Sequence, residues 1–108
     1  MSDRINKSDL STLTDLDRLV HEPARLAVMA LLYVVESADF TFVINQTGLT
    51  WGNLSAHISK LEEAGYLEAQ KRFKGKRPNT TLRLTTQGRE SFQKYVLRMR
   101  KMLKDYPI

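Results

Sequence analysis

The strongest constraint on the fold is a change of hydrophobic period at Gly65. Upstream, Leu54, Ile58 and Leu61 recur at i, i+4 and i+7, which is the spacing of one helix face. Downstream, apolar and polar residues alternate in "YLEAQKRF" and again in "TTLRLT", which is the period of a β-strand. The turn-rich "KGKRPN" between these two runs predicts a β-hairpin with a long basic tip.

Helical periodicity also predicts the other elements of the chain. A first helix is expected over 10–20, and "HEP" ends it. Pro23 suits the first turn of a second helix, which runs to about residues 37–39. A short helix over 41–48 would be capped by Thr41 and ended by Gly48, and Thr50 would open the next helix, about 50–64. Thr85 or Thr86 would cap a last helix that reaches about residue 105.

Composition narrows the class of protein. The chain of 108 residues suits one domain, 1–108, whose polar residues 1–9 are expected to fray. It has no cysteine, so thiolate metal sites and a thiol nucleophile are excluded, and we expect no metal or cofactor. No apolar run approaches the roughly 20 residues that cross a bilayer, and residues 1–10 lack a signal-peptide centre. We therefore expect a cytoplasmic protein without a membrane partner.

Charge is divided unevenly along the chain. Residues 1–59 hold four Lys or Arg and seven Asp or Glu, whereas residues 60–108 hold thirteen and five. This asymmetry predicts an anionic partner for the second half. The densest cationic cluster lies in the expected hairpin, over 71–79: Lys71, Arg72, Lys74, Lys76 and Arg77. A loop kept only for solubility would serve as well with mixed charge, so we interpret the cluster as a surface that binds an anionic partner, most often nucleic acid or a membrane surface. Composition alone does not choose between these two.

The order of helices, helix-turn-helix, basic hairpin and last helix is that of a winged-helix domain. "GLTWGNLSAHISKLEEAGYL" resembles the recognition-helix segment of winged-helix regulators of the MarR and ArsR type. "LTTQGRE" resembles the entry to their last helix, and "FKGKRPNTTLRLT" resembles the wing of small stand-alone winged-helix regulators. The resemblance covers Pro23 to Tyr95. It implies a mainly α fold with a small β-hairpin, a winged helix-turn-helix, acting as a DNA-binding transcriptional regulator and not as an enzyme.

Two departures from those families matter. The cysteines common in ArsR-type metal sensors are absent, and MarR-type regulators usually carry further dimer-forming helices at both ends. Ligand sensing is therefore not carried over, and any small-molecule effector is unknown.

The expected recognition helix is small on its outer face. With the apolar stripe in the core, positions such as Gly52, Ala56 and Ser59 point outward, and small side chains let a helix enter a major groove about 12 Å wide. The predicted DNA-binding residues of this helix are Trp51, Gly52, Asn53, Ser55, Ala56, His57, Ser59 and Lys60. Trp51 could instead staple the turn to the core. His57 could instead pack between helices. Phe73 is expected to pack in the strands or the core and not to act as a base wedge.

Two apolar stripes exceed what a winged-helix body needs, one near each end of the chain. They predict a homodimer, with an interface of Leu10, Leu13, Leu16, Leu19, Tyr95, Met99, Met102 and Leu103. The alternative is that the two stripes pack on each other within one chain. Two rival functions also stay open: a winged helix that binds proteins, which predicts an apolar exposed face over 52–63, and an RNA-binding protein.

Overall fold

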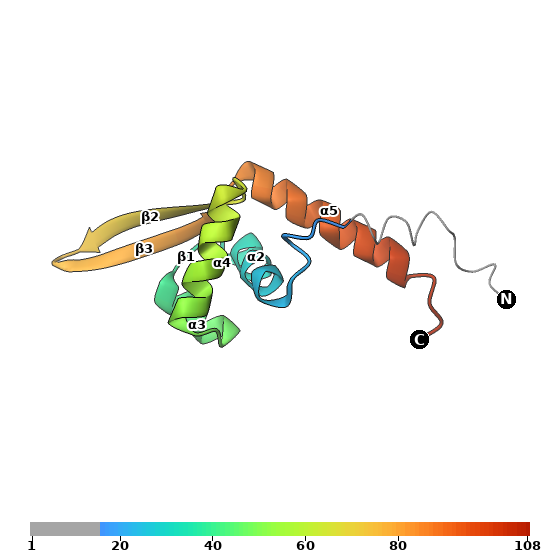
Figure 1. The fold of residues 1–108 in the computed structure, drawn as a ribbon, viewed down its shortest axis with the longest axis horizontal. Coiled ribbons are helices and arrows are strands. Elements are labelled where there is room, and N and C mark those ends of the chain that lie inside the picture. Colours follow the sequence, from blue (N-terminus) through green and yellow to red (C-terminus); the bar gives the residue numbers. More distant parts are fainter. Residues whose placement is uncertain (1–15) are drawn as a thin grey trace.

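The computed structural model describes residues 16–108, which form helices, a hairpin and a last helix in the expected order (Figure 1). The elements are α2 (Pro23–Val35), β1 (Ser37–Asp39), α3 (Phe40–Thr47), α4 (Trp51–Glu63), β2 (Leu67–Lys74), β3 (Arg77–Leu84) and α5 (Thr86–Leu103). In this part of the chain, four helices and a three-stranded antiparallel sheet make up the predicted winged helix-turn-helix.

Side-chain caps fix where the helices begin. Thr50 accepts a hydrogen bond from the backbone N–H of Asn53 and opens α4, and Thr85 does the same for α5 through Gly88, so both predicted caps are confirmed. The predicted Thr41 cap of α3 is wrong. Asp39 accepts from the N–H of Phe42 at 2.8 Å, so the helix begins one residue earlier and includes Thr41.

The sheet has one strand more than the two-stranded wing that the sequence predicts. β1 pairs with β3 in the order β1-β3-β2, and its register runs from Ser37 opposite Arg83 to Asp39 opposite Thr81. Three residues are too few to show a period of two, so β1 leaves no pattern in the sequence. It ties the end of α2 to the base of the hairpin.

The hairpin is also tighter than predicted. β2 and β3 stay in register as far as Lys74 opposite Arg77, which leaves a two-residue loop, Gly75 and Lys76, in place of the long tip. Gly75 has φ 62°, and glycine at the first loop position is typical of a two-residue hairpin. The cationic cluster therefore lies mainly on paired strands and not on an irregular loop.

The predicted helix over 10–20 is not supported within the described residues. Residues 10–15 lie outside them, residues 16 and 17 are not helical, and residues 18–20 form a turn. Asp17 provides the reason, because its carboxylate accepts from the N–H of Leu19 at 2.9 Å and also bonds the N–H of Val20. Such local bonds give the backbone an alternative to helix.

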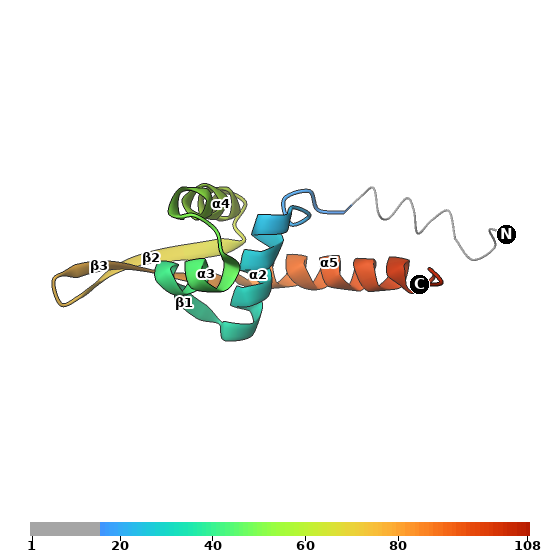
Figure 2. The same ribbon diagram turned by 90° about the horizontal axis from the view of Figure 1, so that it is seen from below.

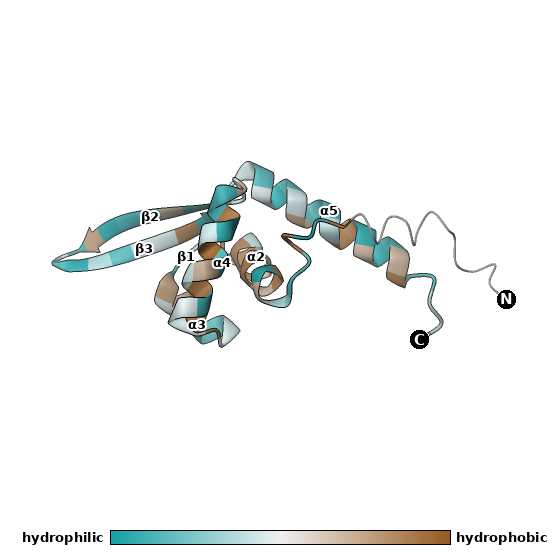
Figure 3. Ribbon diagram, viewed as in Figure 1, coloured by the Kyte–Doolittle hydropathy of each residue, from teal (hydrophilic) through white to brown (hydrophobic). Residues whose placement is uncertain are grey.

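One hydrophobic cluster joins the elements. It includes Val28, Met29 and Leu32 of α2, the predicted stripe of α4 (Leu54, Ile58 and Leu61), and leucines from both strands of the hairpin. The hairpin and α5 leave this body in opposite directions (Figures 1 and 2). Apolar colouring concentrates where α2 and α4 meet (Figure 3).

Candidate nucleic-acid interface

Helix α4 presents a small and polar surface to solvent. Gly52, Asn53 and Ala56 are exposed, as are Ser59 and Lys60, while Ser55 and His57 are half-buried. The stripe on the opposite side is packed against the body, and Glu62 and Glu63 are exposed at the C-terminal end of the helix. A helix with short side chains at its N-terminal end has the shape to enter a major groove, and its first N–H groups favour phosphate.

His57 supports α4 on its neighbour α2. Its Nδ1 lies 3.2 Å from Nη1 of Arg25, whose Nε also donates to the carbonyl oxygen of Leu19 at 2.7 Å. Arginine has no acceptor, so Arg25 donates and Nδ1 of His57 accepts in this hydrogen bond. This contact favours the packing interpretation of His57. Sequence reasoning missed Arg25, because nothing in the local pattern of α2 marks it as a partner for α4.

The start of α2 is fixed by Glu22. Its carboxylate accepts from the N–H of Arg25 at 2.8 Å, and this bond is the main cause that holds the pKa of Glu22 below its ordinary value. An acceptor at the N-cap stabilises the helix that carries the Arg25–His57 contact.

Trp51 packs on a neighbouring helix and also remains accessible to solvent, so both interpretations that the sequence left open stay possible. Its ring stacks on Phe40 at the start of α3, with centroids 5.1 Å apart and planes 29° apart, so it does staple the turn. It nevertheless stays 60% exposed. One side of the indole therefore braces α3 against α4, and the rest is accessible beside the small face of α4.

The register of the hairpin divides its outer half into two faces. Side chains alternate along each strand, and directly opposed residues share a face. One face carries the pairs Lys74–Arg77 and Arg72–Asn79, with Arg72 donating to Gln70 at 2.9 Å. The other face continues the core leucines outward, through Lys71–Thr80 to Phe73–Pro78. All five predicted wing cations are exposed.

Of the two sites expected for packing of Phe73, the strands or the core, the core is wrong, because the ring stands opposite Pro78 on the paired strand. Phe73 shares a face with Leu67 and Ala69, but it is 75% exposed and lies outside the core cluster. The hairpin extends beyond the helices of the described part of the chain, so none of these helices covers this face at its outer end (Figure 1). In Figure 3 a hydrophobic band interrupts the hydrophilic colour near the end of β2.

Helix α4 and the cationic hairpin are joined directly. Only Ala64, Gly65 and Tyr66 separate α4 from β2, with Gly65 at φ 79°. Tyr66 donates a hydrogen bond to Asp17 at 2.5 Å, and burial, followed by this bond, raises the pKa of its phenol. This short connection therefore holds the small face of α4 and the cationic hairpin next to each other.

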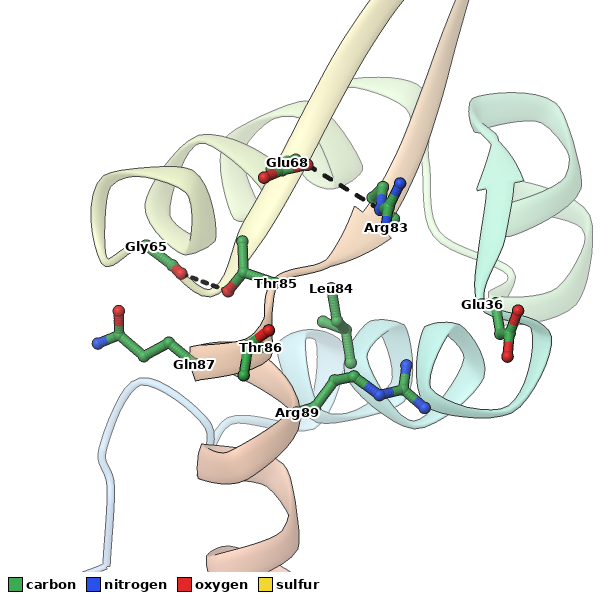
Figure 4. A pocket seen from close by; sticks show the side chains of 9 residues that line it. All are labelled: Glu36, Gly65, Glu68, Arg83, Leu84, Thr85, Thr86, Gln87 and Arg89. Carbon is green, nitrogen blue, oxygen red and sulfur yellow. Dashed lines mark hydrogen bonds and ion pairs between the residues drawn. The ribbon is translucent and has the colours of Figure 1, made fainter.

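A cavity of about 620 Å³ lies at the base of the hairpin, beside the start of α5 (Figure 4). Its charged lining residues are Glu36, Glu68, Arg83 and Arg89. Both arginines already have partners. Arg83 lies 4.0 Å from the carboxylate of Glu68, and Arg89 donates to the carbonyl oxygen of Tyr33 and covers its ring. The cavity therefore offers no unpaired cation to a ligand.

The residues predicted for a dimer interface divide into three groups: two lie outside the described residues, four belong to or border the chain's own core, and two lie on the far half of α5. Leu10 and Leu13 lie outside the described residues. Leu16 and Tyr95 are buried in the chain's own core, and Leu19 and Met99 pack against that core, so the alternative of packing within one chain accounts for these four. His21 hydrogen-bonds the Tyr95 hydroxyl at 2.8 Å, which fixes α5 to the N-terminal segment.

An apolar surface nevertheless remains on the far half of α5. Leu103 is 55% exposed, and Leu97, which is not among the predicted interface residues, is 61% exposed. Met102, Leu103, Tyr106 and Ile108 line one hollow there, and Val96 and Leu97 border another with Phe92.

Comparison with known proteins defines the class. The family described as "Winged helix DNA-binding domain" matches residues 24–103. The chain belongs to this winged-helix DNA-binding family. It is 32% identical over 88 residues to "Uncharacterized protein MJ0432" of Methanocaldococcus jannaschii, covering 82% of this chain and 96% of that relative.

Solved structures agree with the family. The transcriptional regulator homologue protein from Pyrococcus horikoshii OT3 superposes with a TM-score of 0.85 at 25% identity, covering 94% of this chain and 99% of that one. The transcriptional repressor CouR, solved bound to a 23-mer DNA duplex, shares the fold with a TM-score of 0.69 at 20% identity, over 91% of this chain and 73% of its own. MarR-like regulators are among the structures with this fold, so the expected resemblance is confirmed.

Residues 16–108 lack two further features. None of the helices described there has the length and apolar character needed to span a bilayer. No group of three or more His, Asp or Glu in the same range is arranged to hold a metal ion.

Proposed function

We propose that this protein binds specific sequences of double-stranded DNA as a homodimer and regulates transcription. In this proposal Asn53, Ser55, Ala56 and Lys60 of α4 face the major groove, with the rest of the predicted recognition set beside them. The wing cations hold the phosphate backbone or the adjacent minor groove.

One observation carries the proposal. The exposed residues of α4 from Gly52 to Ser59 are small and polar, and the helix leads within three residues into a hairpin whose outer half carries five exposed cations. A recognition helix needs both features, because base edges give specificity and phosphate contacts give position and affinity. A protein-binding winged helix would instead be expected to expose apolar residues over 52–63, and the exposed residues there do not favour it.

The neighbours support the same function. The Pyrococcus horikoshii structure is described as that of a transcriptional regulator homologue, and the CouR repressor was solved on a DNA duplex. Their shared fold makes the helix and wing of this chain the natural DNA-contacting elements.

Homodimer formation is supported by the exposed apolar residues Leu97 and Leu103 on the projecting half of α5. A single winged helix reads few base pairs. Two copies related by a two-fold axis would read half-sites about 34 Å apart, one helical turn, and combine their binding energies.

The experiment is selection of bound sequences from a random pool of duplex DNA by the full chain. We expect an enriched palindrome whose half-sites are spaced by about one helical turn. Binding to the enriched duplex is then compared with binding to its scrambled sequence and to the same sequence as duplex RNA. Equal affinity for all three would contradict specific DNA recognition, and a preference for the RNA duplex would favour the rival function.

A further inference from the structure

Phe73 and Pro78 form an exposed apolar pair among cations. They are directly opposed across β2 and β3, one pair before the loop-closing residues Lys74 and Arg77. Phe73 is three-quarters exposed, and Pro78 is exposed as well. Since Phe73 lies outside the core cluster, its ring adds little to the packing of the fold.

The backbone holds this pair rigidly. Opposed pairs in an antiparallel hairpin alternate between hydrogen-bonded and non-hydrogen-bonded, and Lys74–Arg77 closes a two-residue loop. Phe73–Pro78 is therefore a non-hydrogen-bonded pair, in which the side chains lie closest together. Proline costs no ladder bond there, because its nitrogen points away from β2 and β1 reaches only as far as Thr81.

The surrounding charge identifies the occupant. Lys71 shares the face of the apolar pair, Arg72, Lys74 and Arg77 lie on the opposite face of the same hairpin end, and Lys76 is in the loop, so a partner that offers an anion together with an apolar surface fits this end best. Duplex DNA has both: phosphates line its grooves, and stacked bases and sugars form the floor and walls of the minor groove. Phenylalanine and proline are among the residues that proteins insert between base steps from the minor groove.

We propose that Phe73, backed by Pro78, is a wedge that enters the minor groove of the bound DNA, partly unstacks one base step and bends the duplex. This inference rests on the proposed DNA binding. It adds a non-ionic contact to a wing whose other contacts are electrostatic, and it gives the protein a preference for flexible pyrimidine–purine steps at the wing position.

The test uses the full chain and the duplex enriched by the wild type, labelled at both ends with a donor and an acceptor dye. Bending is read from energy transfer, and affinity is read over a series of salt concentrations. The variant is Phe73→Ala, with Phe73→Leu to retain an apolar side chain. Val34→Ala, which truncates another highly exposed apolar residue on α2, is the matched control.

We expect Phe73→Ala to bind on the order of tenfold more weakly, since it loses most of the apolar surface of one aromatic side chain. The salt dependence should be unchanged, because no phosphate contact is lost, and the bend should diminish. Phe73→Leu should keep most of the affinity and bend, and Val34→Ala should match the wild type. Thermal unfolding should be unaffected in all three variants.

Wild-type affinity and bend in Phe73→Ala would overturn the wedge while leaving the proposed function intact. A wild-type chain with no preference for any duplex would refute the proposed function and the wedge together. A loss seen only on anionic lipid vesicles, with DNA binding unchanged, would assign the pair to a membrane surface and overturn the proposal.

Discussion

Gly88 touches the backbone of Tyr66. A Cβ at Gly88 would lie 2.0 Å from the Tyr66 carbonyl oxygen, which also accepts a hydrogen bond from the N–H of Thr85 at 3.0 Å. Thr85 in turn donates its hydroxyl to the carbonyl oxygen of Gly65. The first turn of α5 therefore packs against the short connection between α4 and β2. This contact sets the angle between α5 and the unit formed by α4 and the hairpin.

Gly88→Ala should destabilise the fold by about 3 kcal/mol, because the added methyl meets backbone atoms that cannot move without shifting α5 or β2. Gly52→Ala is the matched control: it lies on a helix, and a methyl group added there would meet nothing within 4 Å. That change should stabilise by roughly 0.5–1 kcal/mol through helix propensity. Urea unfolding followed by circular dichroism measures both, and similar stabilities for the two variants would contradict the close approach.

Arg77→Ala should reduce the salt dependence of DNA binding. Each phosphate contact contributes a slope of about −0.9 to log affinity against log salt, so losing one contact flattens the slope by roughly one. Affinity for all sequences should fall alike. Lys94→Ala, which removes one cation from α5, is expected to leave the slope unchanged. Fluorescence anisotropy over a salt series is the measurement. If Arg77→Ala keeps the wild-type slope, the wing does not contact the DNA phosphates.

Asn53→Ala and Lys60→Ala should lower specificity more than total affinity. A lost bidentate contact to a base costs about 1–3 kcal/mol of discrimination. The ratio of affinities for the enriched and scrambled duplexes should fall accordingly, as measured by competition. Glu90→Ala on α5 serves as a control that changes an exposed side chain elsewhere. If both α4 variants keep the wild-type ratio, the free face of α4 does not read the bases.

Leu97→Glu and Leu103→Glu should convert a dimer into a monomer, since a carboxylate in an apolar interface loses its hydration without gaining a partner. Light scattering coupled to size exclusion gives the mass directly. Val34→Glu, at an exposed apolar position on α2, should remain dimeric. Truncation before Tyr95 is a poor test because that residue is part of the core. If the wild-type chain is a monomer at tens of micromolar, this result contradicts the proposed homodimer and the expected palindromic DNA site.

The raised pKa of Tyr66 predicts how stability changes at alkaline pH. Burial and the bond to Asp17 hold the phenolic proton more tightly in the folded chain than in the unfolded chain, where the pKa is about 10. The resulting stability is present below about pH 10 and is lost as pH rises through the folded-state pKa. Tyr66→Phe should therefore show a shallower loss of stability above pH 10, in unfolding experiments run as a pH series.

Much of the candidate site was predictable from local pattern. The 3.6-residue period placed the stripe of α4, and with it the small free face, because burial of one side of a helix determines what the other side exposes. Thr50 and Thr85 were recognisable as caps since N-capping depends on the residues of a single turn. The alternation after Gly65 predicted the hairpin and located its cations, although not the tightness of its loop.

The features decided by tertiary structure depend on residues far apart in the sequence. β1 exists because β3 offers it an edge, and three residues carry no period of their own. Arg25 and His57 meet only because α2 crosses α4, and the need for glycine at Gly88 comes from the Tyr66 backbone that lies against it. Leu16 and Tyr95 belonged to stripes that looked free, but both are buried in the chain's own core cluster. Phe73 is the clearest example of a feature that the local sequence pattern cannot predict. The alternating pattern predicts that Phe73 lies on the same hairpin face as Leu67 and Ala69. Only the length of the hairpin, which extends past the body of the domain, exposes the outer end of that face to solvent.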